Sequence, residues 1–289
     1  MIVRSPSVTE RRRCSLGPLA GGLAVVATLL AHGGVAAAYH TSDDHITDDT
    51  AWTLKGSKDW RVGLYKASVT IGDRVTLGTY LLPWIARTPS AFAKVRFLSL
   101  GPSQWAAEAG FFRLDTAAFD GTGSNAPVFT VGTAELVSSI ELGKNHQLSN
   151  NLVGTVVRVS GEIDQDTLRG TGEGGLTNLQ YVLAYEWRIS RVLALVVTGR
   201  YQLFQVLAGE STFTARPDDY TSIDVVAAAS DDHIVNFRYA FSVVPAVAWS
   251  WENFNLRFGV GYGNFNVPGV NFMINRRTPI PELDLYWTF

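Results

Sequence analysis

The sequence predicts a transmembrane antiparallel up-and-down β-barrel of about 12 strands, with about 10 strands as the alternative. Three observations lead to this fold class: an N-terminal leader that is basic and then apolar, a series of long segments with alternating apolar and polar residues, and connections that alternate between short and long. The 289 residues are 46% apolar and carry a formal net charge of -2. This balance argues against a nucleic-acid partner, which would need a concentrated basic surface.

The first 38 residues have the three parts of an export signal. Arg11 to Arg13 make a basic start, residues 16–30 form an apolar run, and Ala36 to Ala38 supply the small residues of a cleavage site. The apolar run is shorter than the roughly 20 strongly apolar residues that a membrane-spanning helix needs. We therefore expect a signal peptide over residues 1–38. Because Cys14 is the single cysteine, the mature chain would contain no disulfide.

The mature chain contains segments in which apolar residues recur with a period of two. The clearest is residues 236–251, where the odd positions are Phe, Tyr, Phe, Val, Pro, Val, Trp and Trp and the even positions are mostly small or polar. The pattern recurs in residues 179–189, 193–203, 254–262 and 282–289. Because successive side chains of a strand point to opposite faces, each segment has one apolar face and one polar face.

A soluble β-sandwich also alternates, but two features favour a membrane barrel. The segments are longer than the usual strand of about 5 to 6 residues and suit strands that are tilted across a bilayer. Their minor faces also carry Arg200, Arg238 and Arg257 in mid-strand. A sandwich core would exclude these arginines, whereas a water-filled or charge-paired lumen accepts them.

The connections support the same topology, because membrane barrels alternate short periplasmic turns with longer external loops. With these connections, eleven strand segments follow from Arg61 onward, and residues 50–54 are the candidate for the twelfth strand. An even number of strands places both termini on the periplasmic side. Residues 39–49 would then be a short periplasmic segment before a barrel formed by residues 50–289. Read backward, the links are residues 266–281 (long), 252–253 (short), 208–234 (long), 190–191 (short), 161–175 (long), 143–146 (short), 115–127 (long), 101–104 (short), 87–90 (moderate) and 72–73 (short).

The last residues carry a family resemblance. Leu283, Leu285 and Trp287 alternate with polar or aromatic residues and the chain finishes in Phe289. This ending resembles the last-strand signal of bacterial outer-membrane proteins, which the barrel-assembly machinery recognises in that family. Residues 52–79 also resemble the opening of a group of uncharacterised, porin-like barrels from Gram-negative bacteria. The resemblance implies an outer-membrane location, with the membrane lipids and the assembly machinery as partners, and it implies no substrate.

Ionic side chains on the predicted inner faces are the candidate functional residues. They can line a narrow polar channel, or they can pair across the lumen and fill it. Aromatic residues on the apolar faces next to the short turns predict an interfacial girdle. The predicted lumen residues are Arg61, Glu135, Glu141, Arg158, Glu186, Arg188, Arg200, Arg238, Arg257, Glu282 and Asp284. The predicted girdle residues are Tyr185, Trp187, Trp249, Trp251, Phe254, Trp287 and Phe289.

We expect a passive channel for small polar solutes or ions, with a closed structural or surface-binding barrel as the alternative. An enzyme is less favoured. His233 beside Asp231 faintly resembles the site of omptin proteases, and His146 with Ser149 could suggest a lipid hydrolase, but both motifs are short. Since no phosphate loop, dinucleotide fingerprint or metal-ligand spacing occurs in the sequence, we expect no cofactor and no metal.

Overall fold

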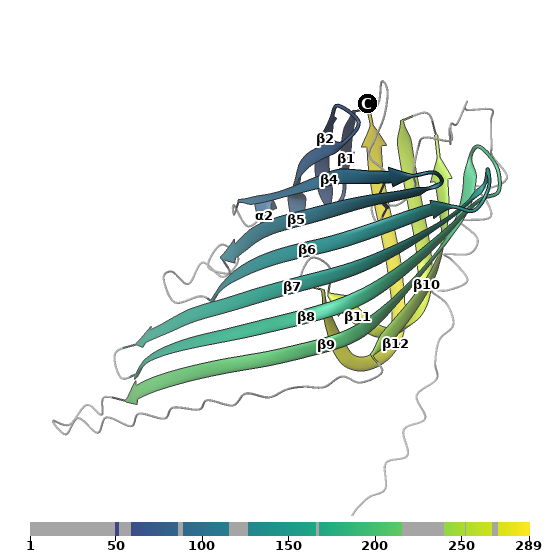
Figure 1. Ribbon diagram of the computed structural model, residues 1–289. Helices are drawn as coiled ribbons and strands as arrows, with labels where there is room; N and C mark the ends of the chain where they lie inside the picture. The colour runs from purple at the N-terminus through teal and green to yellow at the C-terminus, as the bar shows by residue number, and fades with distance from the viewer. Residues whose placement is uncertain are drawn as a thin grey trace, which may run out of the picture. The chain divides into compact units, whose positions relative to one another are not determined.

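The computed structural model describes residues 50–51, 59–85, 89–115, 127–165, 168–215, 240–251, 253–267 and 271–289. These residues form a closed antiparallel barrel of twelve strands, in which each strand pairs with its sequence neighbours and β1 pairs with β12 (Figure 1). The predicted fold class and strand number are therefore confirmed. The strands are β1 (Trp60–Gly63), β2 (Lys66–Ile71), β3 (Val75–Tyr80), β4 (Ser90–Leu100), β5 (Ser103–Asp115), β6 (Val128–Glu141), β7 (His146–Gln165), β8 (Leu168–Arg188), β9 (Leu193–Ala215), β10 (Phe241–Ser250), β11 (Phe254–Val267) and β12 (Phe272–Thr288).

A short helix, α2 (Leu81–Ile85), follows β3, where the sequence predicted that a strand continues to the link at residues 87–90. Within the described part of the chain, no helix has the length and apolar character needed to cross a bilayer. Several predicted features lie outside the described residues: the signal peptide (1–38), the segment 39–49, the Asp231–His233 cluster and Arg238.

The first strand of the barrel is not the one that the sequence suggested. The single predicted segment from Arg61 to Ile71 is a hairpin of β1 and β2, and it turns at Leu64 and Tyr65. Lys66, which interrupts the apolar alternation, is the first residue of β2. This split supplies the twelfth strand. Of the expected strand 50–54, the described residues Thr50 and Ala51 are outside any strand and are buried.

Two predicted long loops are largely strand. β7 continues to Gln165 and β8 begins at Leu168, so that most of residues 161–175 forms a hairpin. Likewise β12 begins at Phe272, inside the predicted loop 266–281. Both stretches lack the apolar alternation that marks lipid-facing strands, yet the backbone pairing continues without it. The predicted loop 208–234 is shortened in the same way, because β9 runs to Ala215.

The two faces of the barrel wall have opposite character. Large apolar side chains such as Leu77, Leu136, Leu183 and Val247 are exposed on the outside. The alternate residues point inward, and many of them are buried polar side chains. A soluble protein would place these two sets the other way round, whereas a lipid environment requires this arrangement. The chain therefore has the architecture of an outer-membrane β-barrel.

The wall is uneven in height. β1 has 4 residues and β2 and β3 have 6 each, whereas β8 has 21 and β9 has 23. The short turns, Trp60 and Phe289 lie at one end of the barrel, which we call the turn end, and the opposite end is the loop end. A strand of 4 residues reaches only about 14 Å, less than the roughly 25 Å height of a lipid-facing band. The wall at β1 is therefore low.

The hairpin of β11 and β12 bends away from the wall at the loop end. Gly263 adopts a φ of 143°, and the register between the two strands shifts between Asn264 and Asn266. At Gly261 a Cβ would lie 2.2 Å from the carbonyl oxygen of Val243, so only glycine fits this close approach to β10. These features direct the tip of the hairpin into the lumen.

Candidate functional site

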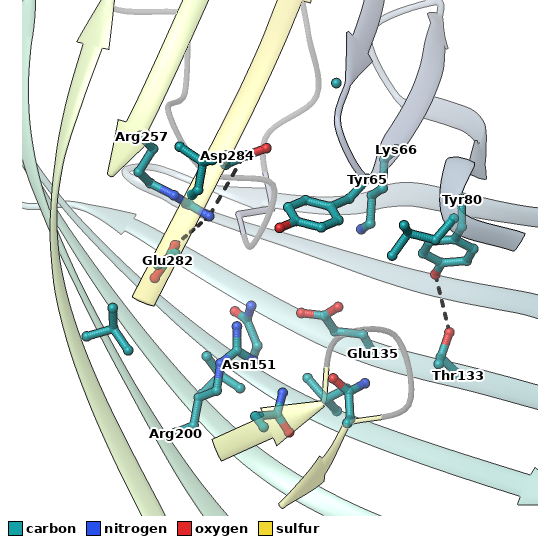
Figure 2. Close-up of a pocket in the computed structure, with 18 of the residues that line it drawn as sticks. Tyr65, Lys66, Tyr80, Thr133, Glu135, Asn151, Arg200, Arg257, Glu282 and Asp284 are labelled. Atoms are coloured by element: carbon teal, nitrogen blue, oxygen red, sulfur yellow. Dashed lines mark hydrogen bonds and ion pairs between the residues drawn. The ribbon is translucent and has the colours of Figure 1, made fainter. Parts of the chain in front are cut away.

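A cavity of about 650 Å³ lies inside the barrel. Its boundary is formed by the β1–β2 turn, by α2, by inward residues of strands from β5 to β10, and by the infolded β11–β12 hairpin. Figure 2 shows Arg257, Glu282 and Asp284 grouped on one side of this cavity and Tyr65 with Lys66 on another. We call it the lumen cavity.

The side of the lumen cavity near the turn end is built by a network of ion pairs. Arg257 lies 2.8 Å from a carboxylate oxygen of Glu282 and 3.8 Å from one of Asp284. Arg61 lies 3.4 Å from the same Asp284 oxygen. The Arg61 guanidinium also stacks over the ring of Tyr286, 3.6 Å from its centroid. Because Arg61 and Asp284 are buried, these contacts offset the cost of removing both charges from water.

A second ionic group comes from residues that the sequence reasoning missed. Lys66 Nζ lies 3.2 Å from a carboxylate oxygen of Glu108 and 4.9 Å from the ring centroid of Phe92. Nearby, the hydroxyls of Tyr80 and Thr133 lie 3.5 Å apart. In the sequence, Lys66 and Glu108 each appear as a charge within a segment whose apolar alternation is weak. A search for a period of two therefore gives these two residues no importance.

The lumen cavity is lined by equal numbers of opposite charges. Its four cationic and four anionic side chains sum to no net formal charge. A balanced set of this kind binds no ion of one sign strongly, but it places charged groups in a cavity that apolar side chains such as Phe112, Val182 and Ile280 also line. The cations are Arg61, Lys66, Arg200 and Arg257, and the anions are Glu108, Glu135, Glu282 and Asp284.

Amide side chains hold the hairpin tip against β7 and β8. The Gln180 amide donates to Oδ1 of Asn266 at 3.0 Å and also to the backbone carbonyl of Asn271. Asn178 donates to the same carbonyl at 2.8 Å, and Asn271 donates to the hydroxyl of Thr155 at 3.0 Å. We call these five residues the amide cluster. Since Gln180 is 0% exposed, the amide cluster narrows the lumen on the loop side of the cavity.

A smaller cavity of about 330 Å³ lies at the turn end, lined by residues that include Glu141, Lys144 and Arg188. Glu186 is buried beside it, with an oxygen 2.9 Å from Arg188 Nε. Between the two cavities the lumen is narrowed by Ala51, whose N–H donates to the Ser139 hydroxyl at 2.8 Å.

The structure brings together six of the predicted lumen residues around the lumen cavity: Arg61, Glu135, Arg200, Arg257, Glu282 and Asp284. Glu141, Glu186 and Arg188 lie at the turn end instead. The prediction for Arg158 is wrong. Thr155 and Val157 are buried on the inward face of β7, whereas Arg158 is exposed on the outward side. Residues 156 and 157 are both valine, so the alternation of apolar and polar residues does not show which of the two faces of this strand points inward.

The predicted girdle residues have outward positions at the turn end. The rings of Trp251 and Phe254 stack at 5.2 Å between centroids, and Phe254 lies 5.0 Å from Trp287. Tyr185 and Trp187 both stack against His146, which also shares a hydrogen bond of 2.7 Å with the Tyr185 hydroxyl. His146 is therefore engaged in this aromatic stack. The remaining members, Trp249 and Phe289, occupy outward positions on β10 and after β12, and Trp60 joins them through its backbone bond to Phe289.

The chain matches no protein-family model and no curated protein. Among solved structures, it is similar to the Pseudomonas putida toluene transporter TodX, with a TM-score of 0.41 and 11% identity over 87% of this chain and 74% of that protein. It is also similar to the ferric citrate transporter FecA in its unliganded form, with a TM-score of 0.38 and 13% identity over 78% of this chain. The chain spans 41% of the length of FecA. At these values the likeness is one of general barrel architecture, and the function rests on the residues of this chain.

Proposed function

We propose that this protein is a passive outer-membrane channel for small polar solutes or ions, narrowed by its own infolded hairpin. The observation that carries this proposal is the lumen cavity of about 650 Å³ with its balanced set of eight charges. A lining of mixed charge favours hydrated ions and small polar molecules over apolar ones. Around twelve strands also enclose a lumen between the filled eight-stranded barrels and the open sixteen-stranded porins, so side chains and loops decide its patency.

The narrow part of the lumen on the loop side of the cavity is itself polar. On the loop side, both polar side-chain atoms of Gln205 and Oε1 of Gln180 are buried and have no hydrogen-bond partner among the described residues. Buried amides of this kind are normally bonded by water or by a solute. A polar solute that leaves the cavity past the amide cluster therefore exchanges its hydrogen bonds instead of losing them.

A closed structural or surface-binding barrel is the second candidate function. The burial of Thr50 and Ala51 in the lumen favours it. So does a cluster of small inward residues that is almost fully buried near the turn end, formed by Ala194, Val196, Ala246 and Ala248.

Swelling of proteoliposomes separates the two candidates. Vesicles that contain the folded barrel are diluted into isotonic solutions of sugars of increasing size. A narrow polar channel predicts swelling in arabinose and none in raffinose. The protein is first shown to be folded by the shift of its gel mobility on heating. If vesicles with this folded protein swell in neither sugar, the channel hypothesis is wrong and the closed barrel is favoured.

A further inference from the structure

The seam between β1 and β12 is paired over only a few residues. β1 pairs with residues 286–288 of β12, and the Leu64 N–H donates to the Leu285 carbonyl at 2.8 Å. β12, however, begins at Phe272. Over Phe272–Asp284 the edge of β12 that faces β1 has no strand partner within the described chain, although its other edge pairs with β11.

Two prolines occupy this free edge. Because Phe289 and Leu285 both bond to the β1 side, the odd-numbered residues of β12 direct their backbone N–H and C=O groups toward the seam. Pro279 and Pro281 are odd-numbered and have no N–H to leave unpaired. An unpaired donor is costly within a bilayer, and proline in a sheet is confined to edges of this kind. The sequence of β12 therefore suits an edge that stays open.

The lumen cavity extends around this edge. Glu282 and Asp284 line it from the inward face of β12, and Pro281 and Leu283 line it from the outward face of the same strand. A cavity that touches both faces of one strand passes the edge of that strand. Leu283 is 43% exposed on the outside of the barrel, so the cavity reaches the lipid-facing surface.

The opposite side of the opening is formed by α2. Leu82 and Pro83 line the same cavity, and the N–H of Leu81 donates to the carbonyl of Tyr65 at 2.8 Å, which ties α2 to the β1–β2 turn. The apolar residues that line the cavity here, which we call the rim, come from two elements: Leu82 and Pro83 from α2, and Pro281 and Leu283 from β12.

The depth of the opening identifies what it meets. Trp287 lies in the aromatic girdle, and Leu283 is four residues further along β12. This separation is about 14 Å along a strand, or roughly 10 Å of depth at a tilt of about 40°. In an apolar band of roughly 25 Å this level is within the hydrocarbon, where acyl chains are the available molecules.

We propose that this opening is a lateral binding site for a single-chain zwitterionic amphiphile from the membrane. Its acyl chain lies between the apolar rim residues, and its head lies in the lumen cavity among the charges of Arg61, Lys66 and Glu108. The cavity has no net formal charge, so a head that carries both signs finds partners for each, whereas an anionic or cationic head adds an unbalanced charge. The volume of about 650 Å³ is within the range of small-molecule sites.

The site does not rest on the proposed channel, because a closed barrel could hold the same molecule. Its test is therefore made without any measurement of flux. The folded barrel is reconstituted in vesicles that contain a small fraction of a lyso-phosphocholine with a photoreactive diazirine in its head group. After irradiation, mass spectrometry locates the adducts. Adducts on the peptides that carry the inward residues Glu108 and Glu135 report entry, and adducts near Trp287 report ordinary contact with the bilayer surface.

The proposal predicts adducts at Glu108 and Glu135 in the wild type. Leu283→Trp, which fills the rim, should abolish them and leave the adducts near Trp287 unchanged. Leu183→Trp is the matched control, because Leu183 is an exposed outward residue on β8, away from the seam. Absence of interior adducts in the wild type, or their persistence in Leu283→Trp, would overturn the lateral site. Equal interior labelling by a fatty acid with the same photoreactive group would overturn the preference for a zwitterion.

Discussion

Asn271 at the tip of the β11–β12 hairpin donates a hydrogen bond of 3.0 Å to the hydroxyl of Thr155, which faces inward from β7. The β11–β12 hairpin, which is part of the wall near the turn end, is thus attached to β7, which lies four positions from β11 in the order of the strands. This contact and its amide neighbours hold the hairpin tip on the loop side of the cavity.

Release of the hairpin should widen the channel. Gln180→Ala removes the side chain that bonds both Asn266 and Asn271, so we expect faster swelling of proteoliposomes and entry of sugars that the wild type excludes. Loss of these hydrogen bonds should also lower stability by about 1–3 kcal/mol. Gln147→Ala is the matched control, since Gln147 is also buried but lies at the turn end. An unchanged size limit in Gln180→Ala would show that the hairpin does not form the constriction.

Removal of one cavity charge should change ion preference. Arg257→Ala leaves Glu282 and Asp284 with fewer cationic partners and gives the lumen cavity a net negative charge, so its channel should prefer cations more strongly than the wild type. The measurement is the reversal potential in a potassium chloride gradient. Arg158→Ala is the control, because Arg158 is exposed on the outward side of β7. A shift with Arg158→Ala and none with Arg257→Ala would contradict the assignment of the lumen.

The bend of β11 depends on glycine. Gly261→Ala would place a Cβ 2.2 Å from the Val243 carbonyl oxygen and 2.6 Å from a methyl group of Val244, so backbone must shift. We expect a loss of about 1–3 kcal/mol in the free energy of unfolding, measured by denaturant titration in detergent. Gly132→Ala is the matched control, since a Cβ there meets no heavy atom within 4 Å. Equal stability of the two variants would count against the close approach.

Phe289 closes the barrel, and we propose that it also completes the signal for assembly. Its N–H donates to the Trp60 carbonyl at 3.0 Å, and its side chain is 57% exposed on the outside at the turn end. Phe289→Asp should therefore lower the amount of heat-modifiable barrel in the membrane, because a charge replaces an interfacial ring. Phe289→Tyr, which keeps the ring, should assemble normally. Wild-type levels of Phe289→Asp would remove this role.

The sequence predicts the wall of the barrel well where lipid contacts it. β9, β10, β11 and the end of β12 stand out because one face of each must be apolar in a bilayer. The pattern fails at β1 and β2, whose 4 and 6 residues are too few for a clear alternation. It also fails in the outer parts of the β7–β8 and β11–β12 hairpins, where backbone pairing continues without an apolar alternation.

The candidate site is harder to predict than the wall. Arg200, Arg257 and Glu282 are visible as charges in alternating strands, and the structure places all three around one cavity. The amide cluster is not visible, because Asn266 and Asn271 have the composition of a solvated loop and reach Gln180 only through the bend at Gly263. A contact between residues about 90 positions apart, set by a backbone bend, leaves no periodic signal in the sequence.

Single-channel recording in a planar lipid bilayer tests directly whether the barrel is a channel. The purified, folded barrel should give discrete conductance steps in potassium chloride, and Gln180→Ala should give larger steps because the hairpin is released. Folded protein that produces no steps, either as the wild type or as Gln180→Ala, would contradict the channel and establish a closed barrel in its place.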